Sequence, residues 1–161
     1  MRYNRSVALI VSPLAGFVVE AKSRTYAGDG GSIPSSVPGE HEHGYERGPW
    51  SYRDRYVGGA DFCGQEVVRH HQVPVWAMVY YGTLLRPAQL DAAVAGHVIK
   101  TALSSLYTEG RFLGGWVADV DGWHYEDVNA GDESSFTGQE CISLDGEVCY
   151  RLWYAGGLTR E

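Results

Sequence analysis

The chain reads WSYRD at residues 50–54, FCGQE at 62–66 and VYYG at 79–82, and these blocks return as WHYED at 123–127, FTGQE at 136–140 and WYAG at 153–156. The copies are 73 residues apart for the first block and 74 residues apart for the other two. Three blocks in the same order at nearly one spacing predict an internal repeat, with units at about 12–82 and 87–157. Because two copies are too few for a solenoid, we interpret residues 1–161 as one pseudo-symmetric domain.

Each unit is predicted to contain three antiparallel strands. In the first unit the side-chain pattern alternates over residues 50–56, continues with β-branched and polar residues over 62–69, and predicts a third strand over 75–81. In the second unit the sequence LDGE at 144–147 is a strong hairpin signal, because glycine tolerates the positive φ of tight turns. We therefore expect the same three-stranded meander twice.

A helix is expected before each meander. Ser12 and Pro13 form a good helix start, and apolar residues at helical spacing follow up to about Tyr26. Pro87 opens a second amphipathic stretch over residues 88–107. The predicted fold class is α+β, with two pseudo-symmetric α-βββ units whose antiparallel sheet or sheets are covered by the helices. Residues 28–48, rich in Gly, Ser and Pro, are predicted to form a long loop.

The composition bounds the class of protein. A net charge of −7 leaves little room for the basic face that nucleic-acid binding requires. No run approaches the roughly 20 apolar residues of a membrane span. An odd count of 3 cysteines, without an evident signal peptide, favours a reducing compartment, so we expect a cytoplasmic protein. The 21 glycines, 11 tyrosines and 5 tryptophans favour strands, tight turns and ring-lined surfaces.

Two glutamates lie among apolar neighbours on the predicted strands. Residues two apart on a strand share a face, so Glu66 and Glu140 each point the same way as a nearby phenylalanine and glycine. A carboxylate in such a place needs a donor, a pocket or a raised pKa. The W-x-Y-x-D blocks add rings and a further carboxylate on one face. The candidate ligand-binding residues are therefore Trp50, Tyr52, Asp54, Glu66, Trp123, Tyr125, Asp127 and Glu140.

We favour a small-molecule-binding or sensor domain with an aromatic pocket around the paired glutamates. Carboxylates and ring faces together suit a small organic cation, through ion pairing and cation–π attraction. One alternative is a small hydrolase or isomerase in which Glu66 or Glu140 is the general base. Another is an interaction module without a pocket, in which exposed rings form the face of a homodimer.

The two glutamates also have an ordinary structural interpretation. Each could pair with Arg53, Arg55 or Arg151 and merely fix the strand register, or lie on a solvated face of the sheet. The register is not determined by the sequence, and a one-residue slip would exchange the two faces. Both interpretations stay open on the sequence alone.

Other chemistry has weaker support. His41 and His43 could chelate a metal from one strand face, but they fall in the predicted loop, where solvated histidines are the ordinary outcome. The sequence contains no G-x-S-x-G, H-E-x-x-H or P-loop motif. We therefore predict neither a metal nor a cofactor.

A further motif, EAK-x-x-TYA, ends the first predicted helix at residues 20–27. Together with the W-x-Y-x-D, F-x-G-x-E and Y-x-G blocks, it resembles a bacterial domain of unknown function, number 5680, over about residues 14–158. That domain often follows a helix-turn-helix of the XRE type, which implies a ligand-sensing or regulatory role. About a dozen residues precede the first expected helix, too few for a helix-turn-helix, so direct contact with nucleic acid is not expected.

Overall fold

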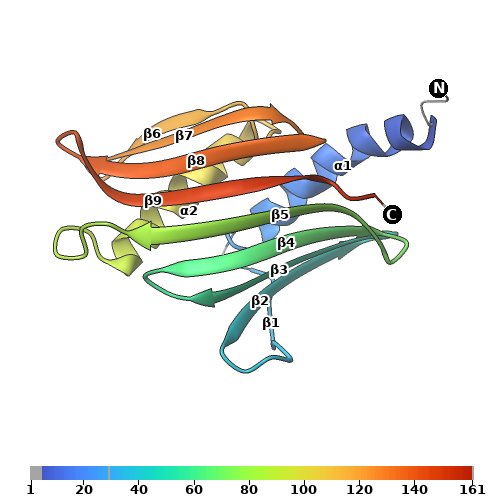
Figure 1. The fold of residues 1–161 in the computed structure, drawn as a ribbon, viewed down its shortest axis with the longest axis horizontal. Coiled ribbons are helices and arrows are strands. Elements are labelled where there is room, and N and C mark those ends of the chain that lie inside the picture. Colours follow the sequence, from blue (N-terminus) through green and yellow to red (C-terminus); the bar gives the residue numbers. More distant parts are fainter. Residues whose placement is uncertain (1–4, 29, 161) are drawn as a thin grey trace.

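Over residues 5–28 and 30–160, which the computed structural model describes, the chain forms one antiparallel sheet of nine strands and two helices (Figure 1). The helices are α1 (Arg5–Arg24) and α2 (Ala92–Thr108). The strands are β1 (Ser32–Ile33), β2 (Glu40–Arg47), β3 (Trp50–Gly58), β4 (Phe62–His70), β5 (Val73–Leu84), β6 (Trp116–Val120), β7 (Trp123–Asp132), β8 (Ser135–Leu144) and β9 (Glu147–Leu158). Their order across the sheet is β1-β2-β3-β4-β5-β9-β8-β7-β6.

The two meanders join through β5 and β9 at the middle of the sheet. Tyr80 lies opposite Tyr154, Met78 opposite Gly156 and Gly82 opposite Leu152. Replacing each residue by the one 74 positions away gives the same three pairs. The matched sequence blocks therefore occupy equivalent places on the two sides of this junction.

The predicted fold class is wrong. The protein is mostly β, with one continuous sheet in place of two α-βββ units that each carry a helical cover. The β5–β9 pairing merges the two meanders, and β6 adds a strand before the second one. The predicted loop at 28–48 contains β1 and β2, because its polar residues find partners on the neighbouring strand: buried Glu42 pairs with Arg53 at 3.6 Å and with Arg55 at 3.1 Å.

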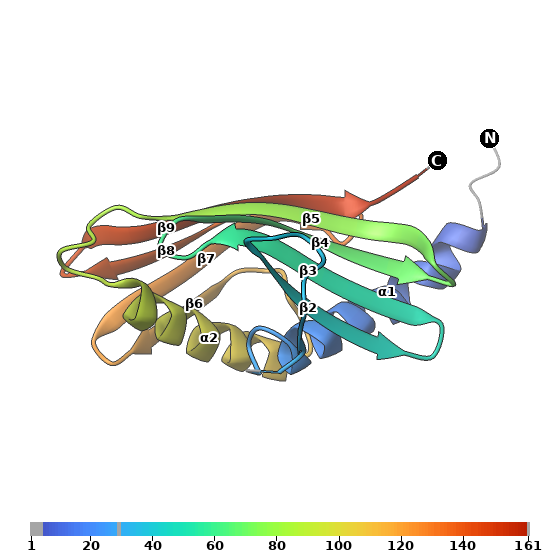
Figure 2. The same ribbon diagram turned by 90° about the horizontal axis from the view of Figure 1, so that it is seen from below.

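Both helices lie against the same face of the sheet (Figure 2). Helix α1 begins at Arg5, earlier than predicted, and Pro13 lies inside it. Helix α2 begins at Ala92, five residues beyond Pro87, because the Asp91 side chain accepts a hydrogen bond from the Val94 N–H at 2.8 Å and caps it. In the part of the chain that is described, no helix is long and apolar enough to cross a membrane.

The core lies between the helices and one face of the sheet. Glu66, Val68, Glu140 and Ile142 are all buried on this face, which confirms the predicted alternation along β4 and β8. Large apolar residues on the other face, including Val79, Tyr81 and Trp153, are about half exposed. The chemistry of interest is therefore on the helix-covered side.

The repeated glycines make room for rings on the next strand. Phe62 lies opposite Gly82, and Gly64 lies opposite Tyr80. A Cβ at Gly82 would lie 2.7 Å from Cζ of Phe62, and one at Gly64 would lie 2.5 Å from Cζ of Tyr80. The second meander repeats this arrangement with Phe136 over Gly156 and Tyr154 over Gly138. The F-x-G-x-E and Y-x-G blocks thus describe two strands whose rings and glycines interlock.

We expect Gly138→Ala to lower the free energy of unfolding by about 1–3 kcal/mol, the usual cost of overpacking a core. Its Cβ would overlap the Tyr154 ring, which is buried against Phe136 and hydrogen-bonded to Asp127. Urea denaturation at pH 7 measures the change.

The matched control is Gly96→Ala in α2, where a Cβ would meet nothing within 4 Å. Removing a glycine from a helix interior is expected to raise the stability by about 0.5–1 kcal/mol. Equal effects of the two substitutions would contradict the interlocking of rings and glycines.

Candidate functional site

Two aspartate–glutamate pairs lie on the helix-covered face. Asp54 of β3 lies directly opposite Glu66 of β4, and Asp127 of β7 lies directly opposite Glu140 of β8. All four side chains are buried. Directly opposite residues have Cβ atoms about 4.5–5.5 Å apart, so two ionised carboxylates would repel each other strongly in a buried place. Each pair therefore needs a proton, a hydrogen-bond donor or a cation.

The first pair is served by a lysine and a tyrosine. The Lys22 ammonium at the end of α1 lies 2.7 Å from Oε1 and 2.6 Å from Oε2 of Glu66. The Tyr80 hydroxyl donates a hydrogen bond to Asp54 at 2.5 Å. Burial, and then the charge of Glu66, raise the pKa of Asp54 to about 7, although the Tyr80 donor and Lys22 act in the opposite direction. Glu66 is thus paired with a cation, while Asp54 exchanges a proton near neutral pH.

The second pair has hydrogen-bond donors on one member only. Asp127 accepts from the Tyr154 hydroxyl at 2.7 Å and from the Asn129 amide at 3.0 Å. Burial raises the pKa of Asp127, and these donors oppose the rise. Within the described residues, Oε2 of Glu140 is buried without any hydrogen-bond partner.

The environment of Glu140 favours its neutral form. Burial, and then the charge of Asp127, raise the pKa of Glu140 to about 8. Lys22 and the Tyr125 hydroxyl act against this rise. The Tyr125 hydroxyl itself is also buried outside hydrogen-bonding geometry with any described group. At pH 7, Glu140 is therefore mostly protonated.

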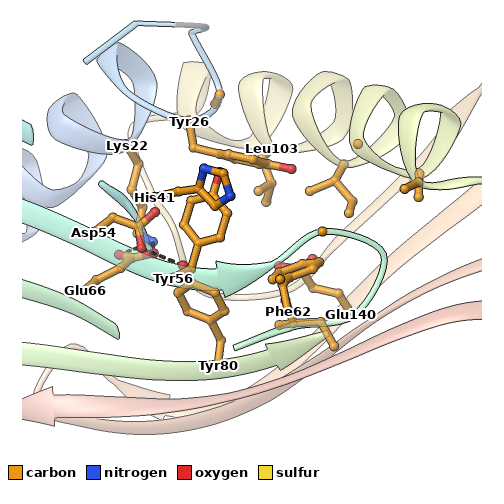
Figure 3. Close-up of a pocket in the computed structure, with 18 of the residues that line it drawn as sticks. Lys22, Tyr26, His41, Asp54, Tyr56, Phe62, Glu66, Tyr80, Leu103 and Glu140 are labelled. Atoms are coloured by element: carbon orange, nitrogen blue, oxygen red, sulfur yellow. Dashed lines mark hydrogen bonds and ion pairs between the residues drawn. The ribbon is translucent and has the colours of Figure 1, made fainter. Parts of the chain in front are cut away.

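A cavity of about 350 Å³ separates this face of the sheet from α2 (Figure 3). Its volume falls in the range of small-ligand sites. In Figure 3, Lys22, Asp54 and Glu66 gather at one end and Glu140 lies toward the other end. The walls between them are rings of the sheet, including Tyr56, Phe62 and Tyr80, and apolar residues of α2, including Ala95, Ile99 and Leu103. The cavity thus combines buried carboxyl groups with apolar and aromatic walls.

The structure brings four of the eight candidate residues to this cavity: Tyr52, Asp54, Glu66 and Glu140. The other four share the same face but do not line it. Trp50 packs against Phe17, with ring centroids 5.5 Å apart. Tyr125 is fully buried, Trp123 packs at the edge of the core, and Asp127 is engaged by Tyr154 and Asn129.

The sequence analysis did not identify several cavity residues. Lys22 and Tyr26 lie in the EAK-x-x-TYA motif, and Tyr80 lies in the closing Y-x-G block. These motifs were visible signals, but no local pattern shows that a helix end docks beside Glu66. Tyr150 lines the cavity from β9 without belonging to any quoted block. The proposed pairing of Glu66 or Glu140 with arginine is wrong for Glu66, whose partner is Lys22.

The histidines of the predicted loop lie on β2 instead. His41 lines the cavity and stacks on Tyr56 with ring centroids 4.9 Å apart. Burial lowers the pKa of His43, which lies 3.3 Å from the carbonyl oxygen of Gly30. Among the residues that the structure describes, no group of three or more His, Cys, Asp or Glu side chains is placed to hold a metal ion.

The fold and the cavity define a mostly-β domain in which a single antiparallel sheet and two helices enclose buried carboxyl groups. The chain belongs to the family described as Domain of unknown function (DUF5680), whose model matches residues 54–159. The matched range contains all four buried carboxyl groups of the two pairs and begins after Lys22. No curated protein and no solved structure matches the chain significantly.

Proposed function

We propose that this domain binds a small organic molecule that carries a positive charge. The observation behind this proposal is the 350 Å³ cavity, which holds Asp54, Glu66 and Glu140. Lys22 is the one lysine or arginine among the described residues that line it, and it is paired with Glu66. A cationic ligand would therefore meet two carboxyl groups that have no cation of their own.

The walls of the cavity suit the same kind of ligand. Tyr56 and Phe62 meet edge to face at 6.5 Å, and ring faces attract cations when they are shielded from water. Residues Ala95, Ile99 and Leu103 of α2 offer apolar contact to the body of a ligand. Both features favour an organic cation over a hydrated metal ion.

We propose a sensing role for this binding. The resemblance to bacterial domains that follow XRE-type helix-turn-helix domains favours a regulatory use in the cytoplasm. In that role the bound and free states would be distinguished by a partner protein, and the domain would not contact nucleic acid itself.

A thermal-shift screen of organic cations, with neutral molecules of the same shape, tests the proposal. A ligand at 100 times its Kd stabilises the folded state by about 2.7 kcal/mol, which raises Tm by about 5–10 °C for a chain of this size. We expect Glu66→Gln or Glu140→Gln to reduce the shift. The matched control is Glu126→Gln, the same change at an exposed position of β7, which should leave the shift intact. A screen in which no class of ligand changes Tm would contradict binding.

A second candidate function is acid–base catalysis by Glu140. The observation that favours it is the pKa of about 8, since a carboxyl group that holds its proton near neutral pH can act as a general acid. This candidate requires turnover of a bound molecule that Glu140→Gln abolishes and Glu126→Gln does not. Binding that is stoichiometric and leaves the ligand unchanged would reject catalysis and leave the binding function standing.

A further inference from the structure

The first half of the sheet contains an ammonium already in place. The Lys22 ammonium contacts both carboxylate oxygens of Glu66 at 2.6 and 2.7 Å, and both side chains are more than nine-tenths buried. Short N–H···O contacts of this kind to a carboxylate are among the stronger hydrogen bonds in proteins. The pair shows how a buried glutamate at this position of the meander is satisfied.

Glu140 occupies the matched position in the second half without such a partner. It lies between Asp127 and Leu152 on its row, as Glu66 lies between Asp54 and Met78. Its side chain is 8% exposed, it lines the cavity, and its Oε2 has no hydrogen-bond partner among the described residues. Arg111, near Asp127, is held by the carbonyl oxygens of Leu113 and Gly115 at 2.7 and 3.0 Å.

A neighbouring residue adds an acceptor that the first half lacks. Tyr150 of β9 lines the cavity, and its hydroxyl is buried without a hydrogen-bond partner in the described structure. The matched position in the first half is Trp76, whose indole N–H can only donate. A tyrosine hydroxyl can accept a hydrogen bond, so Glu140 and Tyr150 together offer acceptors for a group with several N–H donors.

We propose that Glu140 binds the ammonium group of a primary amine, as Glu66 binds Lys22, and that the body of the amine lies in the cavity beneath α2. This inference rests on the proposed function and names the charged group and its docking residue. A quaternary ammonium cannot reproduce the arrangement, because it has no N–H donors to satisfy Oε2 of Glu140. A neutral alcohol of the same shape supplies one donor and no charge.

Proton release provides an independent readout. Because the pKa of Glu140 is raised to about 8, an ammonium that binds its carboxylate at pH 7 must displace most of one proton. Several charged or titratable groups lie around Glu140 and share in this equilibrium. They are Lys22 on α1, Glu66 on β4, Tyr107 on α2, Tyr125 and Asp127 on β7, and Tyr150 on β9.

The test compares three probes that share one ring: benzylammonium, benzyltrimethylammonium and benzyl alcohol, each titrated into the intact protein by NMR and by calorimetry. We expect benzylammonium to bind at least about tenfold more tightly than the other two, since a charged hydrogen bond is lost in each of them. Calorimetry at pH 7 in two buffers of different ionisation enthalpy should show release of nearly one proton. Glu140→Gln should remove both effects, and Glu126→Gln should remove neither.

The outcomes separate this inference from the proposed function. Binding of benzyltrimethylammonium or benzyl alcohol as tightly as benzylammonium would overturn the inference while the cavity remained a binding site. Binding of benzylammonium that survives Glu140→Gln, or that releases no proton, would overturn it as well. If no organic cation perturbs cavity resonances at any concentration, both proposals fail. Glu140→Gln is expected to fold, so loss of binding in that variant will not reflect unfolding.

Discussion

Lys22→Met is expected to lower the free energy of unfolding by about 3–5 kcal/mol at pH 7, the usual cost of leaving one member of a buried ion pair without its partner. Methionine keeps most of the apolar stem of the lysine, so the loss isolates the charge. The two side chains are 9% and 7% exposed, so water cannot take over the role of the ammonium. The remaining carboxyl group of Glu66 would lie directly opposite Asp54, and one of the two must take up a proton.

Urea denaturation of the variant and the wild type measures this loss. The double variant Lys22→Met/Glu66→Met should recover most of the stability, because a buried ion pair can be replaced by apolar residues at little cost. Arg24→Met on the same helix is the control: its side chain is 64% exposed and its partner Glu20 lies 3.7 Å away, so a change below about 1 kcal/mol is expected. A loss for Lys22→Met no larger than that of Arg24→Met would show that the pair does not hold α1 to the sheet.

The strands of the two meanders could be predicted because their signal is local. Alternation along residues 62–68 and 136–142 places Glu66 and Glu140 on the face that becomes buried, and tight turns fix where the strands end. Strand β2 could not be predicted in this way. Its polar residues look like loop, and only their partners Arg53 and Arg55 on β3 explain why Glu42 is buried there. The partners of an edge strand are a tertiary property.

The candidate site was only partly predictable for the same reason. Strand periodicity places Trp50 and Asp54 on one face, but it does not show which of them α1 covers. Trp50 packs under Phe17 of α1, while Asp54 opens into the cavity beneath α2. The different fates of Glu66 and Glu140 depend on a lysine more than 40 residues before the first of them. The matched blocks predict equivalent positions on the sheet, and the helices make those positions chemically unequal.

Glu140→Gln is expected to stabilise the ligand-free protein increasingly as the pH rises. The pKa of Glu140 is about 8 in the folded state and near its ordinary value of 4.5 in the unfolded chain. Between these values the folded state holds a proton that the unfolded state has lost. The free energy of unfolding of the wild type therefore falls by about 1.4 kcal/mol per pH unit on account of this one group. Glutamine has no proton to lose, so the variant should gain about 3–5 kcal/mol relative to the wild type between pH 4.5 and pH 8.5.

Asp54 and His43 also titrate in this range, so the informative quantity is the difference between variant and wild type at each pH. Urea denaturation at pH 5, 6, 7, 8 and 9 gives that difference, and it should grow up to about pH 8 and then become constant. Glu126→Gln, exposed on β7, should give a difference that does not depend on pH. A flat difference for Glu140→Gln would mean that the carboxyl group is ionised in the folded state and already satisfied. In that case it would have no need of an ammonium, and the same denaturation curves would remove the physical basis for ligand binding at Glu140.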